Sequence, residues 1–119
     1  MYQNNIVQRT FLFGVNIVRL SQSIPKTAAG LALSNQIVRS GTSVGANVEE
    51  AQDGLSKKDF IHSMNIALKE ARETNYWLRI LSESNVINSQ ENERILNESV
   101  EIIKILTAIV KKSKENGSH

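Results

Sequence analysis

The stretch that decides the fold is residues 39–81, RSGTSVGANVEEAQDGLSKKDFIHSMNIALKEARETNYWLRIL. Its first part is rich in small residues, and its second part places polar residues between apolar ones at helical spacing. Between them, Gly54 is a good helix stop, and Ser56 with Asp59 resembles a capping box. The pattern predicts two long helices, and the short connector between them makes the helices antiparallel.

Helical periodicity continues on both sides of this hairpin. Four helices with short connectors predict an all-α, up-down-up-down antiparallel four-helix bundle. We expect one domain over residues 1–115 and a disordered tail over 116–119. We expect a first helix from Asn4 or Asn5 to about Ser23, a second from Pro25 or Thr27 to Asp53, a third from about Lys57 to Ser84, and a fourth after Ser89.

Apolar and small residues exceed what one bundle core needs. Gly30, Gly41 and Gly45 lie within the second helix, where their combined propensity cost is roughly 3 kcal/mol. Close packing against a neighbouring backbone can offset this cost. The first and fourth helices are apolar beyond one stripe, and such surfaces are seldom left exposed. The sequence therefore predicts close helix packing and a subunit interface.

Composition and charge limit the class of protein. The 119 residues include 14 basic and 12 acidic side chains, for a net charge of +2, so nucleic-acid binding is permitted but not demanded. The absence of Cys excludes a disulfide framework and thiolate catalysis. The first residues lack the features of a secretory signal, and no apolar run is long enough to span a bilayer. We expect a cytoplasmic protein.

Candidate catalytic groups are few. His62 and His119 are the only histidines, and no Ser-His-acid arrangement follows from their spacing. Residues 59–62, DFIH, are the one near match to the Glu-x-x-His motif of di-iron bundles, and no second copy exists. The sequence therefore predicts no catalytic residue, no metal site and no cofactor.

Polar residues in the hairpin predict a structural motif. Asn47 lies on the small-residue side of the second helix, and Glu73 lies near the apolar stripe of the third. A polar layer can fix the register of a bundle at a cost in stability. We favour this role over catalysis for the set Arg39, Asn47, Glu50 and Glu73, with Arg72 and Arg79 as alternative cationic partners.

Two groups of lysines fall at helix ends. In an up-down-up-down bundle, the start of the third helix and the end of the fourth lie at the same end of the molecule. A solvated helix end is the simplest interpretation for a monomer. In an assembly with these ends on one side, the charge becomes a surface able to meet phosphates. This candidate nucleic-acid surface, here called the basic pole, consists of Lys57, Lys58, Lys111, Lys112 and Lys114.

The hairpin resembles a known family. An ordered set of residues carries the resemblance: Arg39-Ser40, Ser43-Val44, Asn47-Val48-Glu49-Glu50-Ala51, Lys58-Asp59-Phe60, residues 66–74 (IALKEARET) and Tyr76-Trp77-Leu78. It is similar to the small bacterial four-helix bundle proteins encoded in intervening sequences of 23S ribosomal RNA genes. These are relatives of the accessory variability protein of diversity-generating retroelements. Ala51 stands where the family usually has Gly.

The resemblance implies an up-down-up-down bundle, a ring-like homopentamer and no enzymatic activity. For the retroelement relatives it implies binding to nucleic acid and to a reverse transcriptase through a basic surface. Our first hypothesis is therefore a non-enzymatic oligomeric bundle that binds RNA or DNA, or a protein working on them. The second is a purely structural protein–protein interaction module. Both remain open at the level of the sequence.

Overall fold

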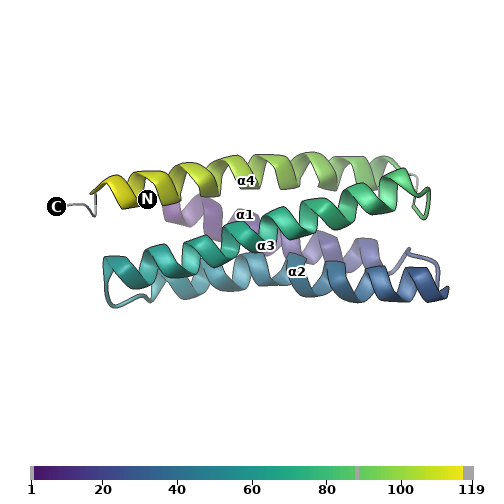
Figure 1. Cartoon of the computed structure of the whole chain (residues 1–119), viewed down its shortest axis with the longest axis horizontal. Helices are drawn as coiled ribbons and strands as arrows, with labels where there is room; N and C mark the ends of the chain where they lie inside the picture. Colours follow the sequence, from purple (N-terminus) through teal and green to yellow (C-terminus); the bar gives the residue numbers. More distant parts are fainter. Residues whose placement is uncertain (1, 88, 117–119) are drawn as a thin grey trace.

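The computed structural model describes residues 2–87 and 89–116, which form the helices α1 (Tyr2–Ser21), α2 (Ala28–Gln52), α3 (Lys57–Glu83) and α4 (Gln90–Asn116). Each helix runs opposite to the one before it, so the chain forms an elongated antiparallel bundle of 51 × 20 × 20 Å (Figure 1). α1 and α3 each pack against both α2 and α4. The predicted up-down-up-down four-helix bundle is confirmed.

Side-chain caps start three of the helices at the predicted places. Thr27 Oγ1 accepts a hydrogen bond from the Gly30 N–H at 3.0 Å, and Ser56 Oγ accepts one from the Asp59 N–H at 3.1 Å. Ser89 Oγ accepts the N–H of Asn92 at 3.2 Å. Each bond satisfies one of the N–H groups that a helix start leaves without an intrahelical partner. These contacts explain why α2, α3 and α4 begin where the sequence predicts.

The first helix departs from the prediction. It begins at Tyr2, so positions 4 and 5 lie inside α1 rather than at its start. Asn is only mildly unfavourable within a helix, so it need not stop one. The helix ends at Ser21 rather than near Ser23, because the next backbone N–H groups bond three residues back, as in a turn.

Two other helix ends also differ from the expectation. Asp53 caps the C-terminus of α2, and Gly54 follows it without a positive φ, so the stop does not use the left-handed conformation that Gly favours. After α3, Asn85 adopts that conformation, with φ of 60°. Asn116 is the last residue of α4, and residues 117–119 of the expected tail lie outside the described residues.

The core is aliphatic and runs the length of the bundle. α1 contributes Phe13 and Ile17, and α3 contributes Met64 and Leu78, all at most 2% exposed. Each helix supplies these side chains at spacings of three and four residues, which place them on one face. The main further members are Ile6, Leu20, Ile24, Ile37, Val44, Val48, Leu81, Ile95, Ile102, Leu106 and Ile109.

α1 and α2 approach each other closely through small residues. A Cβ on Gly45 would lie 3.0 Å from the carbonyl oxygen of Thr10, and one on Gly14 would lie 3.7 Å from that of Gly41. The helix backbones are therefore almost in contact at this crossing. This confirms the close helix packing predicted for the small residues at this crossing, where packing contacts can offset the propensity cost of Gly.

Candidate nucleic-acid and subunit interfaces

An ion-pair cluster joins α2 to α3 on the flank of the bundle. Arg39 Nη2 donates to Glu73 Oε2 and, at 3.0 Å, to Gln36 Oε1, while Arg39 Nη1 lies 3.4 Å from Glu70 Oε1. Trp77 Nε1 donates to the same Glu73 oxygen at 3.1 Å. Two of the four residues predicted to form a polar motif, Arg39 and Glu73, are therefore brought together.

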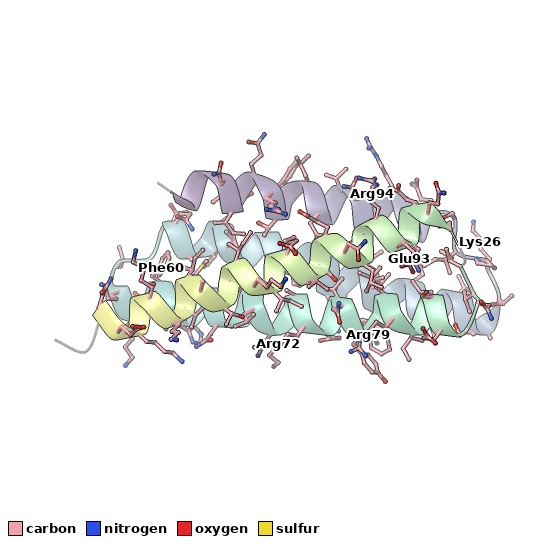
Figure 2. All side chains as sticks on the ribbon, turned by 90° about the horizontal axis from the view of Figure 1, so that it is seen from above. Lys26, Phe60, Arg72, Arg79, Glu93 and Arg94 are labelled. Carbon is pink, nitrogen blue, oxygen red and sulfur yellow. The ribbon has the colours of Figure 1, made fainter. Side chains whose placement is uncertain are left out.

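The other two residues of that predicted set lie outside the cluster. Asn47 Nδ2 donates to the Ser43 carbonyl oxygen of its own helix at 2.8 Å. Glu50 is exposed near the end of α2. Arg72 and Arg79, the alternative partners, project from α3 away from the other helices (Figure 2). The structure therefore brings together Arg39 and Glu73 and does not bring the full set into one layer.

Buried hydroxyl groups provide the polar layer that the charged residues do not. Ser40 Oγ and Thr74 Oγ1 lie 2.9 Å apart between α2 and α3. Between α3 and α4, Asn75 Nδ2 donates to Ser99 Oγ at 3.0 Å. The prediction from sequence gave no role to these pairs. The pattern that could have indicated them is a hydroxyl residue at a core position of an otherwise apolar stripe. Ser40, Thr74 and Ser99 occupy such positions and are fully buried.

A bidentate ion pair links the first and last helices. Arg9 Nε and Nη2 donate to Glu98 Oε2 and Oε1 at 2.7 and 2.8 Å. The hydrogen bond to Glu98 raises the pKa of Arg9 above its ordinary value. This fork geometry is the strongest form of an Arg–carboxylate contact. The pair lies across the seam between α1 and α4, where the bundle closes.

The two lysine groups of the basic pole lie at the same end of the bundle, as predicted. Figure 1 shows the α2–α3 connector and the C-terminal end of α4 at that end. Lys57, Lys58, Lys111, Lys112 and Lys114 are all exposed. Acidic residues share this end: a shallow surface there is lined by Glu50, Asp53, Asp59 and His62, among others. The positive charge of one chain's pole is therefore partly balanced.

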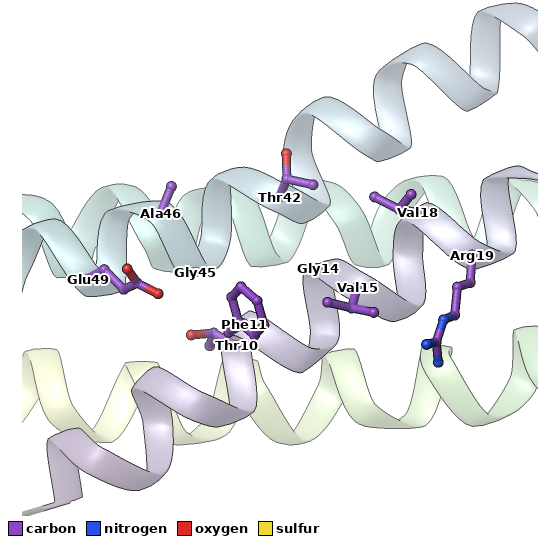
Figure 3. A pocket seen from close by; sticks show the side chains of 10 residues that line it. All are labelled: Thr10, Phe11, Gly14, Val15, Val18, Arg19, Thr42, Gly45, Ala46 and Glu49. Carbon is purple, nitrogen blue, oxygen red and sulfur yellow. The ribbon is translucent and has the colours of Figure 1, made fainter.

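A mostly apolar groove of about 540 Å³ lies along the seam between α1 and α2. Gly14 and Gly45 line it where the two helices approach, and Phe11, which is 58% exposed, stands beside them (Figure 3). Arg19 lies toward one end of the groove and Glu49 toward the other. Phe11 and Val18 thus place part of the excess apolar surface expected on α1 at this groove, whereas Leu12, which is 50% exposed, lies on the α4 side of the helix.

Metal-binding groups and membrane spans are both absent from the described part of the chain. Within residues 2–87 and 89–116, His, Asp and Glu side chains form no group of three or more that could hold a metal ion. None of the helices in these ranges is both long and apolar enough to cross a bilayer.

Comparison with known proteins agrees with this architecture. The family model described as 23S rRNA-intervening sequence protein matches residues 2–108. The chain belongs to this family. The resemblance seen in the hairpin is thereby confirmed, and it extends over all four helices.

This intervening-sequence family member is also similar to a solved structure. That crystal structure is described as a protein with unknown function from the S23 ribosomal protein family from Bacteroides thetaiotaomicron VPI-5482. The two share 43% sequence identity and a TM-score of 0.85, over 93% of this chain and 99% of that chain. No curated protein matches the chain.

Proposed function

We propose that this chain is a non-enzymatic, homo-oligomeric accessory protein that binds nucleic acid, either alone or together with a nucleic-acid-processing protein such as a reverse transcriptase. The main support is the gathering of five exposed lysines at one end of the bundle. The family's name, which refers to 23S rRNA, supports RNA as the first ligand to test. Action on ribosomal RNA would take place in the cytoplasm.

Assembly is an integral part of this proposal. Because Asp53 and Asp59 share an end with the lysines, one pole carries little excess charge. Several poles on one side would add their potentials and raise the local concentration of a polyanion. The α1–α2 groove, with Phe11 beside it, is the surface best suited to join copies, since apolar patches of this kind mark interaction sites. The family resemblance supports a ring-like homopentamer.

Nucleic-acid binding is tested with a mobility-shift titration of structured RNA at low salt and micromolar protein. We expect a shift in the wild type and a weaker one when Lys111, Lys112 and Lys114 are changed together to Gln. The slope of log K against log salt should fall by about 0.7 to 0.9 for each phosphate that the variant no longer neutralises. Lys26→Gln, at the opposite end of the bundle, is the control for removing charge elsewhere (Figure 2). An unchanged mobility of RNA and DNA at low salt would contradict the proposal.

A second candidate function is a protein–protein interaction module without nucleic-acid binding. The observation that favours it is the groove, whose lining suits an apolar helix face better than a phosphate backbone. This alternative predicts that a partner protein stays bound after nuclease treatment. It also predicts that the triple Lys→Gln variant binds this partner as the wild type does.

A further inference from the structure

The outer face of α3 carries a strip of cations around one exposed aromatic ring. Lys69, Arg72, Tyr76 and Arg79 follow one another at spacings of three and four residues, so they lie on one side of the helix. All four are exposed, Tyr76 at 47%. From Lys69 to Arg79 the strip spans about 15 Å at the helical rise per residue. We call these four residues the α3 strip.

The helix sorts its charges between two faces. Both carboxylates within this stretch, Glu70 and Glu73, turn toward α2 and pair with Arg39. In the part of the chain that the structure describes, Lys69, Arg72 and Arg79 form no ion pair. The strip therefore presents positive charge that no carboxylate of the described residues pairs with. Figure 2 shows Arg72 and Arg79 extending on the same side of α3.

The aromatic ring at the centre of the strip is held by its neighbours. Arg79 lies over the Tyr76 ring at 5.7 Å from its centroid, and its Nε donates to Asn75 Oδ1 at 3.0 Å. The Trp77 ring meets Tyr76 edge-on, with centroids 5.1 Å apart and planes at 71°. Trp77 is in turn fixed by its hydrogen bond to Glu73. An exposed ring that is already ordered loses little conformational entropy when another ring stacks on it.

We propose that the α3 strip binds an unpaired segment of nucleic acid, with Tyr76 stacking on a base and the flanking cations contacting phosphates. Exposed aromatic rings beside positive charge are the shared feature of single-strand binding surfaces, and duplex bases are not available to such a ring. The inference rests on the proposed nucleic-acid function and adds a second, lateral contact to the basic pole. The shared chemistry, a base on a phosphodiester backbone, is present in RNA and DNA.

The experiment is a fluorescence titration of the full chain with single-stranded oligonucleotides of about 15 nucleotides, a length within the usual site size. Oligouridylate, oligothymidylate and a duplex of the same length are compared. Trp77 is the one tryptophan in the chain, so its emission reports directly on a base that stacks at Tyr76. We expect both single strands to change this emission, and the duplex to bind more weakly without changing it. A change with oligouridylate alone would assign the site to RNA, through its 2′-hydroxyl groups.

Substitutions separate stacking from charge. Tyr76→Ala should weaken single-strand binding about 5- to 100-fold, as the removal of one base–aromatic stack does, while Tyr76→Phe should bind as the wild type. Arg72→Gln should lower the slope of log K against log salt by about 0.7, the value for one phosphate of a single strand. Lys26→Gln should leave this slope unchanged. Because Tyr76 and Arg72 are exposed, circular dichroism should show an intact fold in each variant.

Two outcomes would overturn the inference in distinguishable ways. If the Tyr76 and Arg72 variants bind as the wild type and only variants of the basic pole lose affinity, the α3 strip is not a site and the proposed function stands. If no oligonucleotide or structured RNA binds at about 50 mM salt, where phosphate contacts are strong, both proposals fail together.

Discussion

Ser40 Oγ and Thr74 Oγ1 face each other at 2.9 Å in the middle of the α2–α3 hairpin, and neither side chain is exposed to solvent. Thr74 Oγ1 also lies 2.8 Å from the Glu70 carbonyl oxygen. This buried contact can form only when α2 and α3 are aligned along the bundle axis so that Ser40 and Thr74 lie at the same height. The pair therefore selects a register in a hairpin whose other core contacts are largely aliphatic.

Changing one member of this pair should destabilise the protein. We expect Thr74→Val to cost about 1–3 kcal/mol, because Ser40 then keeps a buried hydroxyl without its partner. The double variant Ser40→Ala with Thr74→Val should cost less than the sum of the single changes. Urea denaturation measures all three. Thr107→Val is the matched control, since Thr107 makes the same bond to its own helix but is exposed; a cost there equal to that of Thr74 would contradict the role of the pair.

The glycines of the bundle should respond oppositely to a methyl group. A Cβ on Gly30 would fall 1.8 Å from the Pro25 carbonyl oxygen and 2.9 Å from its carbon, both backbone atoms. We expect Gly30→Ala to destabilise the protein by about 1–3 kcal/mol despite the better helix propensity of Ala. Gly14→Ala meets only ordinary contacts at 3.7 Å and should be neutral or stabilising by up to about 1 kcal/mol. Thermal unfolding measures both, and equal effects would contradict the packing described.

The ion pair between Arg9 and Glu98 should contribute modestly. The two side chains are 40% and 32% exposed, so solvent screens them, and we expect a coupling of about 0.5–1 kcal/mol in a double-mutant cycle with Arg9→Met and Glu98→Gln. The pKa of Arg9 is higher in the folded protein than in the unfolded chain. The charged form of Arg9 therefore contributes its full share of the free energy of unfolding at any pH below the unfolded-state pKa, and this share is lost only as the pH rises through the folded-state pKa. The coupling should therefore not change between about pH 7 and pH 9, and it should shrink in about 1 M salt. A coupling that grew with salt would be inconsistent with an ion pair.

The α1–α2 groove gives a direct test of assembly. Phe11→Glu should shift the mass measured by light scattering to that of a monomer, because it places a charge where an apolar contact forms. Phe11→Ala should weaken association about 10- to 100-fold, as expected when one Phe side chain is no longer buried. Leu55→Glu is the control, since Leu55 is 96% exposed in the α2–α3 connector and lies outside the groove. Equal masses for the wild type and Phe11→Glu would exclude this face as the subunit interface.

The sequence predicts much of the fold because the main signals are local. Ser56 and Ser89 lie next to the N–H groups that they cap, so their roles follow from a few neighbouring residues. The start of α1 is less predictable, because Asn4 and Asn5 are tolerated within a helix as well as at its start. The end at which the lysines gather follows from helix order alone, which is why the basic pole is recognised before any packing is known.

The candidate site depends on relations across helices, which spacing along the chain does not fix. From the sequence alone, Arg39 could pair with any of several carboxylates. In the structure it pairs with Glu70 and Glu73, while Arg72 and Arg79 face outward. This pairing forms the α2–α3 ion pairs and leaves the α3 strip basic. The sequence predicts one polar layer from Arg39, Asn47, Glu50 and Glu73, but Glu50 lies about three turns along α2 from Arg39, so it cannot reach the same height.

The sequence by itself determined four helices, their order, the side-chain caps of α2, α3 and α4, and the family, because periodicity and capping act within a few residues of one another. Only the tertiary structure decided which polar atoms meet. The rotation and relative height of each helix are set by the whole core, including the approach of Gly45 to Thr10. A change of one residue in that register would separate Ser40 from Thr74 and redirect the charges of α3. The hairpin at residues 39–81 therefore specifies the architecture, and the packing around it specifies the surfaces that can bind.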